Sequence, residues 1–259
     1  MKTFLNLVLL FMISTSRALP ENSSAEEDPE EIAGLFEGDI VLQLSERSCM
    51  RSEDHHWPHG KVYYKFSEGS FDQVQTSFIK GAMKTIEDVS CVRFIEADDY
   101  QPYFLNITAM NRGCYATVGF WNKIQSFNLK SYPIGEGCYR PGTIVHELLH
   151  SLGFYHMQNA YNRNKYVRVV RKNIKKGHEH NFRKYPKRLS SNFGQKYDYG
   201  SIMHYSPHAF SINGKKTLEP LTKLPKGLLG QRKGFSEYDK KKLNKMYGCS
   251  KKKKNYTHE

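Results

Sequence analysis

Hydrophobic residues recur at two different spacings from residue 60 onward. Residues 62–66 (VYYKF) have the composition of a β-strand, and short β-type runs follow at 92–95, 104–109 and 116–120. Between the first two runs, residues 70–90 carry apolar side chains at an approximately helical period. These side chains are Phe71, Val74, Phe78, Met83, Ile86 and Val89. Strands and helices are therefore mixed, and we expect an α+β fold.

Two further helices are indicated toward the C-terminus. An apolar stretch begins near Thr143, and Ser236-Glu237-Tyr238-Asp239 has the pattern of a capping box that opens a helix. Gly248 can end that helix, because glycine adopts the left-handed conformation common after a helix. A lysine run follows at 251–254, and we expect residues 250–259 to form a disordered basic tail.

The first 18 residues have the organisation of a signal peptide. Lys2 precedes an apolar run at 4–13, and small residues end the segment at Ala18. A membrane anchor would need about 20 apolar residues, and no second apolar span follows. We expect a secreted, extracellular protein with no membrane span, whose cysteines are disulfide candidates. There are five cysteines, Cys49, Cys91, Cys114, Cys138 and Cys249, so one stays unpaired.

An acidic leader at 19–51 precedes a basic body. Residues 1–51 hold nine acidic and four basic residues, whereas residues 52–259 hold 17 and 35, a net charge of +18. The leader is either a solvated linker or a propeptide that an activating protease removes at Arg47 or Arg51, and composition leaves both open. The net charge of +13 over all 259 residues permits polyanionic partners and selects none.

The spacing of three histidines is typical of a metal site. His146 and His150 are four residues apart, so a helix presents both imidazoles on one face toward one ion. Gly153 can end the helix and turn the chain, which brings His156 back as a third ligand. Three protein ligands leave one position for water, as in catalytic zinc sites. Glu147 is out of register with the ligands and suits the role of general base on that water.

A chance match is the alternative to this interpretation. The short HExxH pattern can arise on any helix, where its histidines are simply exposed or hydrogen bonded. The glycine and the third histidine at fixed offsets make the pattern much more specific, and the extended form is characteristic of metzincin proteases. A metzincin also has a methionine-containing turn under the metal, and residues 201–205 (SIMHY) supply one.

These motifs resemble the astacin family of secreted zinc endopeptidases, which belongs to the metzincin clan. The resemblance runs from residues 57–60 (WPHG) through 230–232 (GQR) to 247–249 (YGC), nearly the whole body. It implies one Zn²⁺ per chain, protein or peptide substrates, and a catalytic domain at 52–249. It also implies a zincin-like fold: an N-terminal mixed β-sheet with a backing helix and the active-site helix, a cleft, and an irregular C-terminal subdomain ending in a helix.

The resemblance assigns roles to individual residues as well. Tyr205 would lie near the zinc and stabilise the oxyanion, and Met203 would be a packing floor that does not bind the metal. Substrate would pair as an extended strand with the cleft edge near residues 114–118. The implied disulfides join Cys91 to Cys249 and Cys114 to Cys138.

Residues 36–39 (FEGD) in the leader resemble the propeptide motif of the family, in which an aspartate ligates the zinc and displaces water. Asp39 would then be the ligand that keeps the zymogen latent. A surface carboxylate in an acidic segment is the alternative. Cys49 is a rival latch because thiolates bind zinc, but its surroundings do not match the propeptide cysteine motif of matrix metalloproteases, so we favour Asp39.

The chain departs from the family pattern next to the third histidine and in the loop that follows. Met157 stands where a glutamate usually anchors the new N-terminus, which puts the docking of a terminal amine in question for this chain. Asn162 and Asn164 flank Arg163 where acidic residues are common, so we expect the ion pairing of this loop to differ.

Two other functions are compatible with the sequence. One is a zinc-bound but inactive relative, although ligands, base and tyrosine are all present. The other is a secreted basic protein that holds a sulfated glycan; nucleic acid is not an expected partner of a secreted chain. Its binding residues would be Lys172, Lys175, Lys176, Arg183, Lys184, Lys187 and Arg188. Acceptor sequences for N-glycosylation open at Asn22, Asn106 and Asn255.

Overall fold

The computed structural model of the chain describes residues 28–42, 55–187 and 191–249. The expected signal peptide and basic tail, with Arg47, Cys49, Arg51 and Arg188, lie outside these residues. Among the residues described, no helix combines the length and the apolar character that crossing a bilayer requires.

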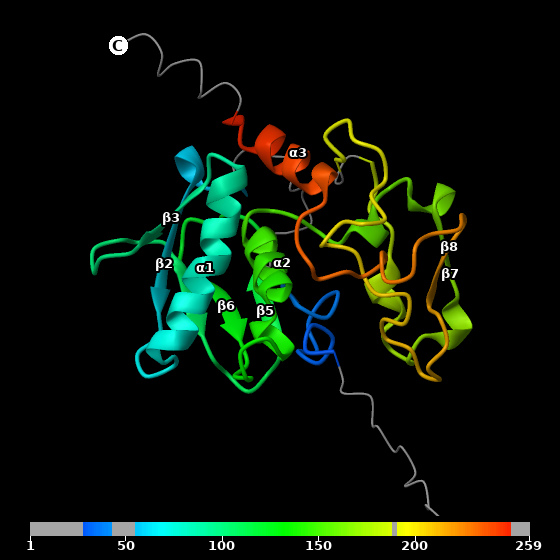
Figure 1. The fold of residues 1–259 in the computed structure, drawn as a ribbon, viewed down its shortest axis with the longest axis horizontal. Helices are drawn as coiled ribbons and strands as arrows, with labels where there is room; N and C mark the ends of the chain where they lie inside the picture. Colours follow the sequence, from blue (N-terminus) through cyan, green and yellow to red (C-terminus); the bar gives the residue numbers. More distant parts are fainter. Residues whose placement is uncertain (1–27, 43–54, 188–190, 250–259) are drawn as a thin grey trace, which may run out of the picture.

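A six-stranded mixed sheet forms the N-terminal half of the body (Figure 1). Its strand order is β1-β5-β6-β4-β2-β3, and every neighbouring pair is parallel except β5 with β6. The strands are β1 (Ile40–Val41), β2 (Lys61–Phe66), β3 (Arg93–Glu96), β4 (Leu105–Thr108), β5 (Cys114–Thr117) and β6 (Gln125–Leu129).

Two helices pack side by side on one face of this sheet, α1 (Gln73–Val89) and α2 (Pro141–Ser151) (Figure 1). The Asp72 carboxylate accepts from the backbone N–H of Gln75 at 2.7 Å and caps α1. Only one side of α1 is buried, whereas every residue of α2 from Gly142 onward is buried. α2 is therefore the central helix, enclosed by the sheet and the C-terminal half.

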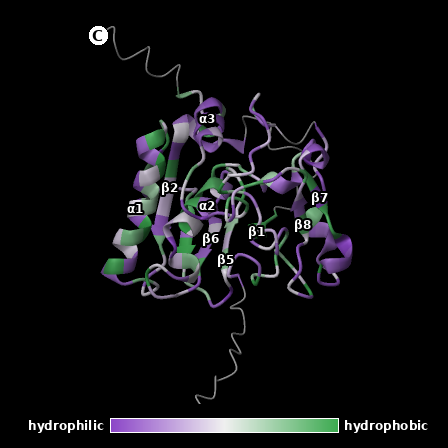
Figure 2. Ribbon diagram, turned by 45° about the vertical axis from the view of Figure 1, so that its right-hand side comes forward, coloured by the Kyte–Doolittle hydropathy of each residue, from purple (hydrophilic) through white to green (hydrophobic). Residues whose placement is uncertain are grey.

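The C-terminal half is mostly irregular. It contains one antiparallel pair, β7 (Val167–Val169) with β8 (Leu218–Pro220), short 3₁₀ turns, and its own core around Phe182, Phe210 and Leu218. The last helix, α3 (Glu237–Met246), returns to the first half and is strongly hydrophilic (Figure 2). The Ser236–Asp239 capping box opens it, and Gly248 follows it with φ +63°. Both helix ends match the sequence prediction.

The described part of the leader runs between the two halves and adds to the sheet (Figure 1). Strand β1 pairs in parallel with β5, with Ile40 opposite Ala116, and the N–H of Ala116 donates to the carbonyl of Asp39 at 2.9 Å. Residues 28–42 thereby occupy the sheet edge along which the resemblance had placed an extended substrate.

The predicted α+β class is confirmed, but strands β1, β6, β7 and β8 were not predicted from the sequence. The run expected at 116–120 forms β5 two residues earlier, and β6 was missed altogether. Its sequence, QSFNL, does not alternate simply between apolar and polar residues. Gln125 and Asn128 are buried because their amides hydrogen bond the backbone of Gly119 and Gly113, which a pattern based on hydrophobicity cannot detect.

Candidate metal centre

Helix α2 presents two of the three histidines. Pro141 at its start needs no hydrogen-bond partner for its nitrogen, and Gly142 packs so closely that an added Cβ would lie 1.8 Å from the Arg232 carbonyl oxygen. Gly153 follows the helix with φ +105° and turns the chain, as expected. The ring of His156 thereby returns to 4.7 Å from His150 and 5.2 Å from His146, measured between centroids.

Each imidazole uses its Nδ1 for a hydrogen bond to a neighbour. His146 Nδ1 bonds the Ile202 carbonyl at 2.9 Å and His150 Nδ1 bonds the Phe154 carbonyl at 2.7 Å. Because a carbonyl only accepts, both Nδ1 atoms carry the proton and both Nε2 atoms present a lone pair. His156 Nδ1 donates to the Glu37 carboxylate at 2.8 Å. The three Nε2 atoms are thus left to face a common centre.

The converging atoms have the spacing of metal ligands. His146 Nε2 lies 3.1 Å from His150 Nε2 and 3.3 Å from His156 Nε2. Four ligand atoms arranged tetrahedrally around Zn²⁺, each about 2.0–2.1 Å away, would be about 3.3 Å apart. Two imidazole lone pairs this close in a buried site repel each other unless a cation lies between them. The three histidines therefore fit zinc.

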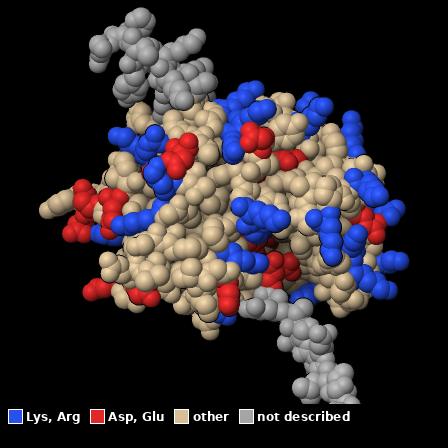
Figure 3. All heavy atoms as spheres, viewed as in Figure 1, with Lys and Arg blue, Asp and Glu red and all other residues tan. Residues whose placement is uncertain are grey.

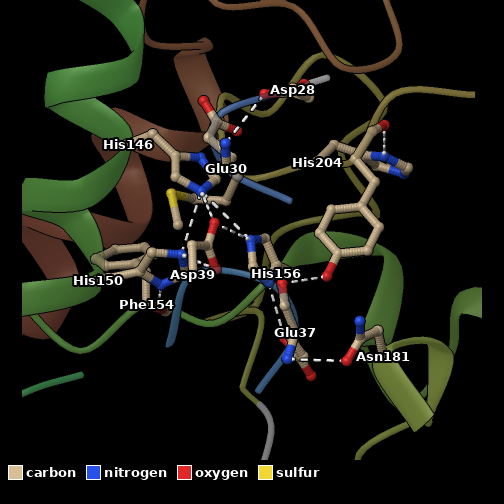
Figure 4. A network of polar contacts seen from close by, with 12 residues as sticks. Asp28, Glu30, Glu37, Asp39, His146, His150, Phe154, His156, Asn181 and His204 are labelled. Atoms are coloured by element: carbon tan, nitrogen blue, oxygen red, sulfur yellow. Dashed lines mark hydrogen bonds and ion pairs between the residues drawn. The ribbon is translucent and has the colours of Figure 1, made fainter. Parts of the chain in front are cut away.

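Asp39 supplies a fourth ligand atom from the leader (Figure 4). Its Oδ2 is 3.2 Å from His146 Nε2 and 3.3 Å from His156 Nε2, and its Oδ1 is 3.5 Å from His150 Nε2. Although burial alone would raise the pKa of Asp39, His156 and His150 hold it well below its usual range. Burial likewise opposes protonation of His156, but Asp39 and Glu37 raise its pKa to about 9. A proton on His156 and a metal ion are alternative ways to neutralise these carboxylates.

Glu147 is buried beside this centre. Neither of its carboxylate oxygens has a hydrogen-bond partner within the described part of the chain. Burial raises the pKa of Glu147 well above its usual range, and the charges of Asp39 and Glu30 add to the effect. A buried carboxylate without partners costs stability, so its presence indicates a function beyond packing.

The turn at 201–205 lies under the histidines and is held by α3. The Asp239 carboxylate accepts from the Ser201 hydroxyl at 2.6 Å and from the Ile202 N–H at 2.9 Å. The Ile202 carbonyl in turn accepts from His146. Met203 is buried, and its carbonyl accepts from the N–H of Met157 at 2.9 Å. Asp239 was recognised in the sequence only as a capping residue, so its second role was missed.

Tyr205 completes the site from the same turn. Its ring centroid lies 4.6 Å from that of His156, and its hydroxyl donates to the Glu37 carbonyl. Its backbone N–H donates to the Gln158 side-chain oxygen at 3.1 Å, which fixes the backbone from which the Tyr205 side chain extends. The structure therefore gathers His146, His150, His156, Glu147, Met203, Tyr205 and Asp39 in one place.

Comparison with known proteins yields one family. The family model described as "Astacin (Peptidase family M12A)" matches residues 49–248, more than half of the chain. The chain belongs to the astacin family of zinc metalloendopeptidases.

Individual relatives agree with this assignment. Seminal metalloprotease 1 of Drosophila melanogaster is 41% identical over 227 residues, which cover 86% of this chain and 90% of that protein. Zinc metalloproteinase nas-4 of Caenorhabditis elegans is 36% identical over 234 residues, 86% of this chain and 72% of the relative. The structure of high choriolytic enzyme 1, a hatching enzyme zinc-protease from Oryzias latipes, superposes with a TM-score of 0.69 at 32% identity, covering 78% of this chain and 98% of that one.

The leader is held by more than Asp39. The Glu37 N–H donates to Asn181 Oδ1 at 3.0 Å, and its carboxylate accepts from His156 (Figure 4). The same carboxylate accepts from Asn159 Nδ2 at 2.7 Å and from the Tyr185 hydroxyl. In the sequence Glu37 was recognised only as part of a motif, because these partners all lie more than 100 residues away.

A buried ion pair anchors the start of the leader. Glu30 pairs with Arg232 and accepts from the Thr143 hydroxyl at 3.0 Å. Burial alone would raise the pKa of Glu30, but Arg232 lowers it to about 2. The sequence offered Glu30 only as one of several crowded acidic residues, without a partner.

The two disulfides have the pairing that the astacin resemblance implies. Cys91 is bonded to Cys249, which ties the end of α3 to the start of β3, and Cys114 on β5 is bonded to Cys138 just before α2. Such cross-links typically stabilise a fold by about 2–4 kcal/mol.

Met157, which stands where the family usually has a glutamate, lies beside a buried lysine. The Lys242 ammonium, from α3, is buried and lies 3.2 Å from the Met157 sulfur. Burial lowers the pKa of Lys242, although Asp239 and Asp198 act in the opposite direction. An amino group of the chain itself therefore already occupies the space beside Met157.

Proposed function

We propose that this chain is a secreted astacin-family endopeptidase, synthesised as a latent zymogen, that binds one Zn²⁺ through His146, His150 and His156. The observation that carries the proposal is the convergence of three Nε2 atoms whose Nδ1 atoms are already engaged. Hydrogen-bonding each Nδ1 orients the ring and fixes which nitrogen faces the ion.

Glu147 serves as the general base in this proposal. Bound zinc would supply a Lewis acid that lowers the pKa of a water molecule and polarises the scissile carbonyl. Glu147, whose oxygens have no other partner, accepts the proton of the attacking water and then delivers it to the departing amine. Burial of Glu147 favours its protonated form, which supports delivery of the proton to the amine. Departure of Asp39 with the leader removes a neighbouring negative charge and supports acceptance.

Tyr205 stabilises the oxyanion that develops on the substrate carbonyl. Its hydroxyl donates to a peptide carbonyl of the leader, that of Glu37, so the same donor can reach a carbonyl bound in the leader's place. A donor already oriented in a buried site stabilises developing charge without reorganisation.

Two contacts of the leader would keep the enzyme latent. Asp39 takes the place among the histidines that the reacting water would need, and β1 pairs with β5, the edge that an extended substrate would use. Activation therefore requires cleavage beyond residue 42 and release of residues 28–42 from the groove. Arg47 and Arg51 are the proposed cleavage sites.

Secretion is supported by the pattern of residues 1–18 and by the two disulfides, because disulfides persist in oxidising compartments. N-terminal sequencing of protein recovered from the medium of secreting cells tests this part of the proposal. Recovery only from the cytosol, with reduced cysteines, would contradict it.

Metal content and peptide hydrolysis, measured before and after cleavage at Arg47 or Arg51, test the central proposal. We expect one zinc per chain in both forms and hydrolysis of an internally quenched peptide mixture only after cleavage. His150→Ala should abolish zinc binding and activity, whereas His180→Ala, at an exposed histidine outside the site, should preserve both. Zinc-free protein under saturating supply, or chelator-resistant hydrolysis, would overturn the proposal.

A further inference from the structure

Arg163 is a buried cation without a carboxylate partner. Its guanidinium donates to the carbonyls of Gln158 and Phe182, to Asn159 Oδ1 and, through Nε, to Asn164 Oδ1 at 3.2 Å. All four acceptors are neutral, and no acidic side chain of the described residues lies within ion-pair distance of it. Its hydrogen bonds are satisfied by neutral groups, and the Glu37 carboxylate acts on its positive charge only from beyond ion-pair distance.

Arg163 and Asn164 line a surface hollow of about 590 Å³ whose other walls carry more positive charge. Arg171, Arg183 and Lys184 border it, and none of the three forms an ion pair with a described residue. Glu179, the acidic residue of the lining, is turned to the backbone N–H of Gly177 at 2.9 Å. Among the described residues, the hollow thus combines a buried cation that has no adjacent carboxylate with three exposed cations outside any ion pair.

A second hollow, of about 390 Å³, adjoins the first. Arg163, Asn164 and Arg171 line both hollows, and Arg168 and Leu221 border the second; we call these two neighbouring hollows together the trough. Residues 163–187 contain ten lysines and arginines and one acidic residue, a net charge of +9 within 25 residues. Blue side chains gather accordingly over the part of the molecule that carries β7 and β8 (Figure 3).

We propose that this trough is a binding site for a sulfated glycan chain, distinct from the peptide-cleaving centre. Guanidinium groups form paired hydrogen bonds to sulfate oxygens, and cations spread along a trough suit a chain that carries anions at intervals. The lining contains arginine, lysine, asparagine, histidine, glutamate and aliphatic residues but no phenylalanine, tyrosine or tryptophan. Nucleic acid, whose bases stack on aromatic side chains, is the poorer match.

The structure also refines the glycan-binding residues expected from the sequence. Arg183 and Lys184 of that cluster line the trough, whereas Lys172, Lys175, Lys176 and Lys187 do not. Arg163, Arg171 and Arg168 replace them, and of these Arg168 is already paired with Glu219. The ligand would therefore lie across η5 (Arg163–Lys165), η6 (Arg171–Asn173) and the segment after η7 (Glu179–Phe182) rather than along one run of sequence.

Asn164→Asp is the sharpest test, because it adds a carboxylate beside Arg163 without removing any cation or changing the side-chain shape. Asn111→Asp makes the same change at an exposed asparagine of the other half. The probe is a heparin-derived decasaccharide, titrated by calorimetry from 50 to 300 mM salt. We expect Asn164→Asp to weaken binding about fivefold or more and to reduce the slope of log K against log salt by about one. Asn111→Asp should change affinity less than twofold.

A charge-matched pair of triple variants provides the second test. Arg171→Ala/Arg183→Ala/Lys184→Ala removes three trough cations, and Lys223→Ala/Lys226→Ala/Lys233→Ala removes three exposed lysines elsewhere. We expect the first to weaken decasaccharide binding at least tenfold more than the second, with peptide hydrolysis by the processed enzyme unchanged in both. Equal losses would show general surface attraction and overturn the site. Tighter binding of a decathymidine oligonucleotide or a phosphorylated peptide of equal charge would overturn the assignment to sulfated glycan.

Discussion

At the scale of single residues, protonation in this site is determined by neighbours that are not themselves ligands. The carbonyls of Ile202 and Phe154 fix the tautomers of His146 and His150, because each can only accept from Nδ1. Glu147 has no hydrogen-bond partner among the described residues, which leaves both its oxygens available to a proton. The contrast separates the groups proposed to hold the ion from the group proposed to move protons.

Replacing Glu147 by glutamine keeps the shape of the side chain and removes its ability to accept a proton. We expect Glu147→Gln to retain zinc, since the three imidazoles are unchanged, and to reduce kcat by at least about a hundredfold. Zinc content by mass spectrometry and turnover of a quenched peptide measure the two effects. Glu179→Gln, at an exposed glutamate, is the control, and full turnover by Glu147→Gln would refute its role as base.

Lys242 is a buried ammonium whose nearest partner is the Met157 thioether, a poor acceptor. Burial lowers its pKa in the folded state, so the unfolded chain binds this proton more tightly and Lys242 destabilises the fold at neutral pH. We expect Lys242→Met to raise the free energy of unfolding by about 1–2 kcal/mol at pH 7. Denaturant unfolding should show this gain shrinking as the pH approaches about 10, where the lysine loses its charge in both states. A gain that does not change with pH would instead indicate better packing.

At the scale of elements, the ends of the helices position the site. The close approach of Gly142 to the Arg232 backbone fixes the start of α2, and Gly153 fixes where its third ligand returns. The N-terminal turn of α3 fixes the turn at 201–205, which lies under the histidines. Asp239 caps its own helix and, with the same carboxylate, holds the Ser201–Ile202 backbone whose carbonyl orients His146.

Removing Asp239 should therefore affect both stability and metal binding. We expect Asp239→Ala to lower the free energy of unfolding by about 2–4 kcal/mol, because several buried donors lose a charged acceptor. We also expect faster loss of zinc to a chelator. Ser236→Ala removes the cap bond and the bond of the same hydroxyl to the Asp198 carboxylate, and it should cost about 1–2 kcal/mol with no change in zinc release. Equal zinc release by the two variants would show that α3 does not support the metal centre.

At the scale of the whole molecule, a leader of fifteen described residues links the two halves across the centre. It contributes β1 to the sheet of one half, and it bonds Asn181, Tyr185 and Phe210 of the other. Its acidic side chains respond differently to docking, because Glu30 is paired with Arg232, whereas Glu31 is half-buried and lies near Lys175.

Docking of the leader should therefore depend on pH through Glu31. Burial raises its pKa to about 8 in the docked state, although the Phe210 N–H lowers it, whereas the free leader has the ordinary value near 4.3. The docked form binds more protons between these values, so docking should weaken as the pH rises from about 5 to 8. Inhibition of the processed enzyme by a synthetic peptide of residues 28–42 measures this.

The Glu31→Gln peptide is the comparison, because glutamine keeps the acceptor for Phe210 and does not titrate. It should bind more tightly than the natural peptide at pH 8 and depend less on pH. Burial raises the pKa of Asp28 to about 6, so a smaller pH dependence of binding should remain in both peptides. Identical pH profiles would exclude Glu31 as the titrating group.

The sequence alone determined the features that depend on local periodicity. A four-residue spacing places His146 and His150 on one helix face in any fold, a glycine permits the turn before His156, and Ser236 with Asp239 caps a helix wherever it packs. The strands were predicted less well, since β5 began earlier than expected and the buried amides of β6 concealed it.

Tertiary structure decided everything that joins residues distant in sequence. Only the folded chain brings Glu37 to His156, Glu30 to Arg232, Asp239 to Ile202 and the leader to the edge of β5. It also leaves Arg163 without a carboxylate inside a cationic trough. Such contacts depend on how elements pack in three dimensions, and neither hydrophobic periodicity nor composition records which polar side chain will face another across the core.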